Sequence, residues 1–294
     1  MAKVKQDENE INRFIIVDML GEKITTYESN KEIESKLFDK ITSTNYEYRA
    51  FTKHLNKTNY ISKKTIYELI CEIGKNEPNT VEDVSIFSHA YSKGPILTNT
   101  DSDDPNDLDM RINDIKDKIF DYTNFKNAFT NDGIFKIWGC NMNRFTNNLI
   151  KQVMKSSKYK KDGTTLDSTI FTIKDTLFQN KDGSYNSVSQ YIYSDCKTTP
   201  KNGIFEMTML QIKKQFARNY WDSFSAWLSN NCDIKVQAAL PSTYASFSSP
   251  NHFRISDDTK DNILFFKTYL EVSIGEYDYG IFDLTTVQKM INIG

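Results

Sequence analysis

Short apolar strands alternate with amphipathic helices through the middle of this 294-residue chain, and this alternation constrains the fold more than any other feature. Between about residues 44 and 240 the order is strand, helix, strand, helix, strand, helix, an irregular segment, helix and strand. Helices between strands imply parallel pairing through right-handed crossovers, with helices on both faces of the sheet. The sequence therefore predicts an α/β fold, specifically a three-layer α/β/α sandwich with a mostly parallel central sheet.

The expected elements divide the chain into a main domain and a tail. Strands are expected at 13–20, 46–51, 81–88, 133–139 and 234–240, and helices at 31–43, 63–74, 110–129, 141–157 and 204–230. A hairpin strand at 23–28 and tail strands at 263–273 and 277–284 are expected to add antiparallel edges before a short terminal helix. We therefore expect one α/β domain over 1–243, with an irregular insertion at about 158–203, and a β-rich extension over 244–294 packed on the same domain.

Charge and hydropathy exclude several kinds of partner. The net charge is −2 with an isoelectric point near 6.0, so there is no overall electrostatic case for nucleic acid or an anionic membrane. No apolar run approaches the roughly 20 residues of a membrane helix, and the first ten residues lack the apolar stretch of a signal peptide. We expect a soluble protein that is cytoplasmic when made, and export by a route without a cleaved signal stays open.

The cysteines and acidic residues do not form a recognisable metal motif. Four widely spaced cysteines without a C-x-x-C pair or a nearby histidine favour reduced thiols over a zinc site, namely Cys71, Cys140, Cys196 and Cys232. The acidic run over 101–109 lacks the glycine and the terminal glutamate of an EF-hand loop. We expect no cofactor, with Ca²⁺ at the 101–109 loop as the alternative. A solvated face is the simplest interpretation of this run and of the lysines near 151–161.

Candidate reactive residues follow three of the expected strands. His89 follows strand 81–88, Cys140 follows strand 133–139, and Ser242 with Thr243 follows strand 234–240. In open parallel sheets ligands bind outside the carboxyl ends of the strands, so these residues are expected to share one rim.

The chemistry expected at this rim is nucleophilic attack by a thiol. A thiol becomes a nucleophile when it is ionised by a helix N-terminus or an imidazole and has a base within hydrogen-bond reach. Cys140 precedes an expected helix and His89 supplies an imidazole, while the backbone amides of Ala90 and Cys140 are candidate oxyanion donors. Ser242 and Thr243 are candidate substrate-binding residues, and Asp101 would favour Lys or Arg side chains of a substrate.

The segments SIFSHA (85–90) and IFKIWGC (134–140) resemble the caspase-like cysteine peptidases, a clan that includes caspases, metacaspases, legumains, clostripain and gingipains. In that clan an apolar strand ends in His-Gly and a later apolar strand ends in the nucleophilic cysteine. The resemblance implies a caspase–haemoglobinase α/β fold, His89 as general base, Cys140 as nucleophile, a peptide or protein substrate and no organic cofactor.

Two departures from the clan's pattern favour an alternative. Ala90 stands where the clan has glycine, and WGCN (138–141) differs from the Gln-Ala-Cys-x-Gly of caspases. The alternative is a catalytically inactive caspase-like module in a larger protein complex, with segment 204–230 or 158–203 as its contact surface. For an active enzyme, autocleavage near 158–161 is a further hypothesis.

Overall fold

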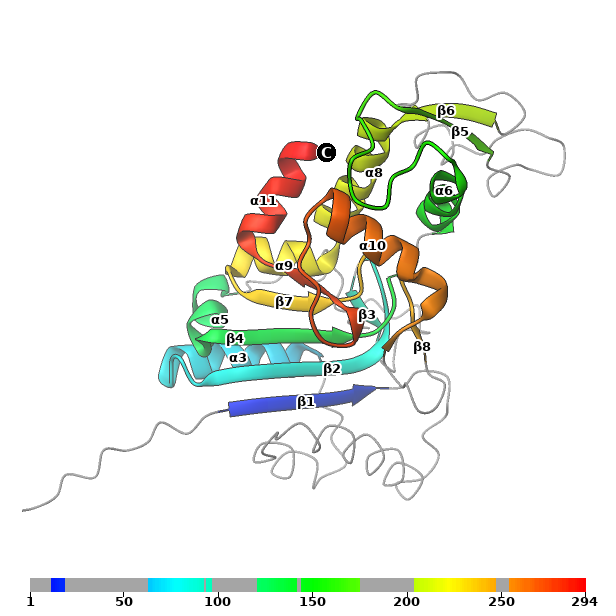
Figure 1. The fold of residues 1–294 in the computed structure, drawn as a ribbon. Helices are drawn as coiled ribbons and strands as arrows, with labels where there is room; N and C mark the ends of the chain where they lie inside the picture. The colour runs from blue at the N-terminus through cyan, green and yellow to red at the C-terminus, as the bar shows by residue number, and fades with distance from the viewer. Residues whose placement is uncertain are drawn as a thin grey trace, which may run out of the picture.

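The computed structural model describes residues 12–18, 63–92, 94–96, 121–141, 144–174, 204–246 and 254–294. Its centre is a sheet in the order β1 (Asn12–Asp18), β2 (Val81–Tyr91), β4 (Phe129–Trp138), β7 (Lys235–Ala238) and β10 (Gly280–Phe282) (Figure 1). The first four strands are parallel, β10 joins β7 antiparallel, and β3 (Gly94–Ile96) folds back on the end of β2. The predicted α/β class with a mostly parallel sheet and an antiparallel edge in the tail is confirmed.

One face of the sheet carries the apolar core. Helix α3 (Lys63–Asn76) packs on α5 (Tyr122–Ala128), α5 contacts β4 and α9 (Phe224–Cys232), and α9 contacts β7. Alternate strand residues such as Val84, Phe135 and Val236 are fully buried in the same core as these helices. The positions between these residues point to the opposite face of the sheet, because successive side chains of a strand alternate between its two faces.

The opposite face carries a row of polar residues across three strands. Ser85 is level with Lys136, and Lys136 is level with Gln237, in the registers of β2, β4 and β7. All three side chains are buried. A hairpin loop over 274–280, closed by the bridge between Ile274 and Gly280, approaches this row, and its Glu276 pairs with Lys136 at 3.6 Å.

A second group of elements lies at the end of the molecule away from β1 (Figure 1). Helix α6 (Arg144–Lys155), the antiparallel pair β5 (Ile170–Lys174) and β6 (Ile204–Thr208), and α8 (Met209–Trp221) belong to it. Thr208 begins α8 with a capping box to Gln211, which satisfies backbone amides of the first turn. Helices α10 (Lys260–Tyr269) and α11 (Leu284–Ile293) complete the described chain, with the short pair β8 (Ala245–Ser246) and β9 (Arg254–Ile255) and the 3₁₀ turns η1 (Asp257–Thr259) and η2 (Glu276–Asp278).

The structure corrects three expectations about secondary structure. The segment expected as a strand over 263–273 is mainly helix α10, so the tail is more helical than β-rich. The helix expected over 204–230 is instead strand β6 followed by two helices that Asp222 and Ser223 separate. The insertion is not wholly irregular, because β5 pairs with β6 across it. A short apolar run such as Ile263 to Phe266 does not reveal by periodicity whether it is a strand or a buried helix.

Other expected elements lie wholly or partly outside the described residues. The strands at 23–28 and 46–51 and the helix at 31–43 fall outside, and of the helix at 110–129 only α5 is described. Helix α3 continues through Gly74, which was expected to end it. No helix in the described part of the chain combines the length and the apolar character needed to cross a membrane.

Candidate functional site

Cys140 lies in the turn that follows β4, and this turn is hydrogen-bonded to the turn after β7. The Asn141 amide donates to the Thr243 carbonyl at 2.8 Å, and the Ser242 amide donates to the Asn141 carbonyl at 2.6 Å. Asn141 and Thr243 form an isolated antiparallel bridge, which is distinct from the parallel pairing of β4 with β7. The backbone just after Cys140 is therefore held by the turn after β7.

His89 reaches the same edge of the sheet on the adjacent strand. Phe87 with Trp138 is the last pair in the parallel register of β2 and β4, and His89 and Cys140 each lie two residues beyond it. His89 lies within β2 rather than after it, because β2 continues to Tyr91 and pairs with β3, with His89 opposite Ile96. Both residues thus come just after the paired parts of adjacent parallel strands, and Ala90, which follows His89, lines one pocket with Cys140.

The described surroundings of the Cys140 thiol favour its protonated form. The sulfur is partly buried beside a cluster that includes Trp138, Ala245 and Tyr279, and it accepts a hydrogen bond from the Ala245 amide at 3.4 Å. Burial raises the pKa of the thiol above its ordinary value, and the Ala245 hydrogen bond offsets only part of this effect. The amide that contacts the sulfur thus comes from β8 rather than from the expected first turn of the following helix.

Two tyrosines that sequence analysis did not single out lie near this thiol. Tyr279 is fully buried and packs edge-on against Trp138, with 5.0 Å between ring centroids, and its hydroxyl has no partner in the described part of the chain. Burial raises the pKa of Tyr279 far above its ordinary range, and the nearby Cys140 thiol adds to this effect. Tyr244 donates a hydrogen bond to Asp258 at 2.7 Å. Tyr279 follows Tyr277 in the segment expected as a strand over 277–284, and neither its spacing nor that of Tyr244 points to Cys140.

Ser242 and Thr243 lie next to Cys140, but both are fully buried. The Ser242 hydroxyl donates to Thr146 Oγ1 at 2.6 Å, and the Thr243 hydroxyl donates to the Leu240 carbonyl at 2.7 Å. Ser242 also has φ of 70°, in the left-handed region. Both hydroxyls are therefore engaged within the protein, where they stabilise the turn after β7.

The remaining acidic candidates are not placed. Asp101 and the whole 101–109 loop, with its Ca²⁺ alternative, lie outside the described residues. Within the residues that are described, no three His, Cys, Asp or Glu side chains gather in a way that could hold a metal ion.

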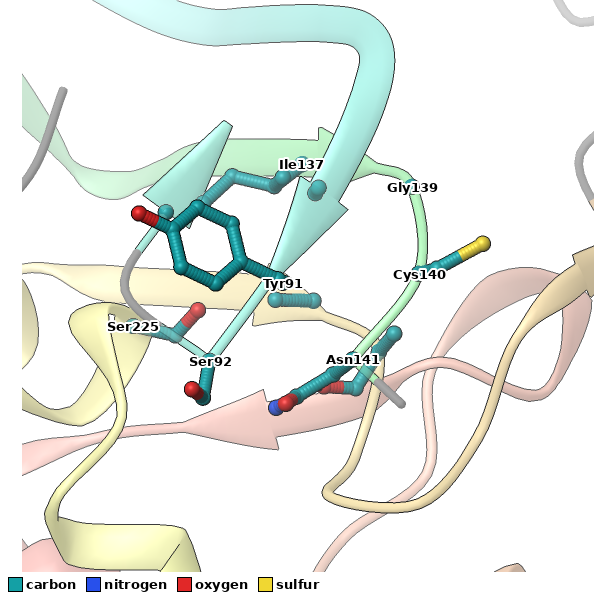
Figure 2. Close-up of a pocket in the computed structure, with 11 residues that line it drawn as sticks. Tyr91, Ser92, Ile137, Gly139, Cys140, Asn141 and Ser225 are labelled. Carbon is teal, nitrogen blue, oxygen red and sulfur yellow. The ribbon is translucent and has the colours of Figure 1, made fainter. Parts of the chain in front are cut away.

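A small pocket opens beside the Cys140 turn (Figure 2). Its walls come from the end of β2, the end of β4, β7 and the start of α9; the lining residues are Ala90, Tyr91, Ser92, Gly94, Ile137, Gly139, Cys140, Asn141, Ser225, Ala238 and Ala239. The centre of a water molecule can occupy about 10 Å³ of this space, which is room for roughly one water. The pocket brings together Ala90 and Cys140, the two candidate oxyanion residues. Ala90 lies in regular strand, where a Cβ is well tolerated.

Asn141 supplies the most deeply buried polar side chain of the pocket, at 5% exposure. Its Nδ2 donates to the Ala239 carbonyl at 3.2 Å, whereas its Oδ1 has no partner in the described part of the chain. A buried acceptor without a donor costs about 1–3 kcal/mol. The sequence held no signal for this residue beyond its position next to Cys140.

The segment proposed for autocleavage is folded. The Lys160 amide donates to Thr165 at 2.7 Å, the Gly163 amide donates to the Lys160 carbonyl, and the Lys158 ammonium donates to the Ile170 carbonyl at 2.9 Å. Cleavage at 158–161 would have to break these contacts first.

Comparisons with known proteins found no matching family model, no matching curated protein and no matching solved structure.

Proposed function

We propose that this protein is a cysteine hydrolase that cleaves peptide or related amide bonds, with Cys140 as nucleophile and His89 as general base. The observation that supports the proposal is that both residues follow the last paired positions of two adjacent parallel strands, at the edge where parallel sheets bind ligands. A caspase-like three-layer arrangement, with helices on both faces of the sheet, belongs to the same proposal.

The proposed reaction needs no cofactor. The Cys140 sulfur attacks the carbonyl carbon of the substrate while His89 takes the thiol proton, and backbone amides of Ala90 and Cys140 stabilise the oxyanion. The carbon–nitrogen bond then breaks, and the amine leaves with the proton that His89 held. Water, deprotonated by His89, hydrolyses the thioester and restores the thiol.

The state of the thiol explains why His89 is essential to this proposal. Burial raises the pKa of Cys140, and the Ala245 amide lowers it by less. A positive charge near the sulfur stabilises the thiolate at neutral pH, and a histidine imidazolium supplies such a charge. Asp101 remains the candidate residue for recognising basic side chains of the substrate. The hydroxyls of Ser242 and Thr243 instead stabilise the turn after β7, beside the turn that carries Cys140.

The test compares wild type with Cys140→Ala, His89→Ala and the control Cys71→Ala on a fluorogenic peptide library. Cys71 is also a partly buried cysteine, but it lies on α3. We expect turnover in wild type and Cys71→Ala, and a loss of about 100-fold or more in the other two variants. Equal turnover in wild type and Cys140→Ala overturns the proposal.

The second candidate is a non-catalytic module that binds partner proteins. The favouring observation is that Cys140 is partly buried, which raises the pKa of its thiol and favours the unreactive protonated form. Helix α8, in the segment expected to form the contact surface, exposes Leu210 and Trp221. A library assay without turnover, together with partner binding that Trp221→Ala weakens and Cys140→Ala does not, would support this candidate over the first.

A further inference from the structure

Helix α6 and strand β5 contain several lysines and no acidic residue. The two elements lie side by side (Figure 1), and the Gln152 side chain joins them. It accepts from the Lys174 amide at 2.8 Å and donates to the Lys174 carbonyl at 2.6 Å. Lys158, which follows α6, donates from its ammonium to the Ile170 carbonyl at the start of β5. The strand therefore runs along the helix, and the outer sides of the two elements adjoin.

Four exposed lysines lie on this outer surface. Lys151 and Lys155 are about one helical turn apart, on the side of α6 opposite its buried residues. Lys174 points away from the core because its neighbour Ile173 is buried and successive side chains of a strand alternate. We call the four residues the basic face: Lys151, Lys155, Lys158 and Lys174.

The positive charge of the basic face is not neutralised by a carboxylate in the part of the chain that the structure describes. The ion pairs found there join acidic residues to other lysines and to Arg254. The basic face extends over about 13 Å, the length of β5 from Ile170 to Lys174. The net charge of −2 gives the molecule no overall attraction to a polyanion, so any such attraction has to be local.

The density of charge decides which anionic partner suits the basic face best. A nucleic acid duplex has one negative charge per about 1.7 Å of its axis, which is about eight phosphates over this length. Four lysines beside an anionic membrane would give a dissociation constant of only about 1 mM, whereas non-specific duplex binding typically lies at about 1–100 μM.

A single strand is a poorer match than a duplex. Proteins that bind single strands stack the bases on exposed aromatic rings. The aromatic residues described beside the lysines, Tyr159 and Phe171, are buried at 7% and 2% exposure. The basic face therefore offers contacts to phosphates and no stacking platform for bases.

We infer that the basic face binds the phosphate backbone of duplex nucleic acid. The lysine ammonium groups replace counterions at the phosphates, so binding is independent of base sequence and strongly dependent on salt. Duplexes of DNA and of RNA share this backbone chemistry. The inference does not involve the Cys140 turn, and it holds whether or not Cys140 is catalytic.

The test follows the fluorescence anisotropy of a labelled duplex of about 20 base pairs while the full chain is titrated at several salt concentrations. Four phosphate contacts predict a slope of about −3.6 for the logarithm of the association constant against that of salt, or binding about 100-fold weaker at 200 mM than at 50 mM. DNA and RNA duplexes are titrated in parallel, and the tighter complex identifies the source of the backbone.

Two triple variants locate the contact. The first removes three lysines of the basic face and keeps Lys158, whose ammonium bonds to β5: Lys151→Gln, Lys155→Gln and Lys174→Gln. Its slope is expected to fall to about −1, because each lost phosphate contact removes about one unit. The matched control removes the same charge at exposed positions elsewhere and should keep the wild-type slope: Lys75→Gln, Lys235→Gln and Lys267→Gln.

The outcomes that overturn the inference are specific. They include no binding of either duplex at about 50 mM salt, and an equal loss of slope in the two triple variants. Tighter binding to phosphatidylserine vesicles, to polyglutamate or to a single strand, compared at equal charge, would assign the basic face to another partner and also overturn the inference.

Discussion

Lys136 and Asp83 form an ion pair inside the central sheet, with 2.7 Å between Nζ and Oδ2 and side-chain exposures of 6% and 8%. Ser85 donates a second hydrogen bond to Asp83 at 2.7 Å, and Glu276 of the 274–280 loop lies 3.6 Å from Lys136. Desolvation of two charges offsets much of their attraction, so such a pair contributes little net stability while it is intact. Removing one partner has a large cost because the other charge stays buried.

The first prediction concerns Lys136→Met. Loss of the ammonium leaves Asp83 buried without its cation, and we expect the free energy of unfolding to fall by about 3–5 kcal/mol. The matched control is Lys126→Met, which breaks the exposed pair with Asp233 and should cost at most about 1 kcal/mol. Urea denaturation measures both values. Similar losses in the two variants would contradict the prediction.

The second prediction is that removing both charges is milder than removing one. The double variant Asp83→Leu with Lys136→Met leaves no unpaired charge, so most of the stability lost in Lys136→Met should return. The residual loss reflects the Ser85 hydroxyl, which then lacks its acceptor. A double variant less stable than Lys136→Met, in the same denaturation experiment, would show that the ion pair is itself strongly stabilising.

The third prediction is that the stability contributed by Asp83 decreases as pH rises. An exposed, salt-bridged carboxylate shows the opposite dependence. Burial raises the pKa of Asp83 above its ordinary value, while Lys136 and the Ser85 hydrogen bond lower it by less. A group whose pKa is raised by folding contributes stability below its unfolded pKa, and this contribution is lost as pH rises through the folded value. The stability of wild type relative to Asp83→Asn should therefore decrease between about pH 3 and pH 7. A relative stability that increases with pH would mean that Lys136 dominates.

The fourth prediction concerns the reactivity of Cys140. Burial raises the pKa of its thiol, so in His89→Ala the rate of alkylation by iodoacetamide should rise with a midpoint above the roughly 8.5 of a free cysteine. Wild type should show a midpoint at least about one pH unit lower when the imidazole is paired with the thiol. Peptide mapping after timed alkylation measures the rate at Cys140 alone. Identical midpoints in the two proteins would remove the support for a dyad.

The fifth prediction tests the contact between two helices. A Cβ on Gly74 of α3 would lie 1.7 Å from the Asn124 carbonyl oxygen of α5, closer than atoms can approach. Gly74→Ala should destabilise the protein by about 1–3 kcal/mol, although alanine is intrinsically the better helix residue. Lys75→Ala, at an exposed position of the same helix, should change stability by less than about 0.5 kcal/mol. Thermal denaturation distinguishes them, and a stabilised Gly74→Ala would contradict the contact.

The sheet could be predicted from the sequence where periodicity was unambiguous. Segments 13–20, 81–88, 133–139 and 234–240 are each bounded by turn residues and correspond to β1, β2, β4 and β7 within a few residues. The helical pattern of 63–74 likewise corresponds to α3. The prediction of a strand over 263–273 was wrong because apolar residues there are nearly continuous, and packing against α6 and the core decides between the two states.

The sequence located the candidate residues along the chain but not their surroundings. The rule for carboxyl ends led to His89 and Cys140, and both come two residues beyond the last pair of β2 with β4. The burial of Ser242 and Thr243, and the partly buried thiol, depend on how the turns after β4 and β7 hydrogen-bond to each other. Such pairing between segments about 100 residues apart leaves no periodic trace in the sequence.

The two backbone hydrogen bonds of Asn141 have a practical consequence. They hold a peptide that carries a titratable sulfur on one side and a fixed acceptor on the other, so neither side can move without the other. A substitution that loosens the turn after β7 is therefore expected to change the alkylation rate at Cys140. The thiol is in this sense a chemical reporter of how firmly the turns after β4 and β7 are joined.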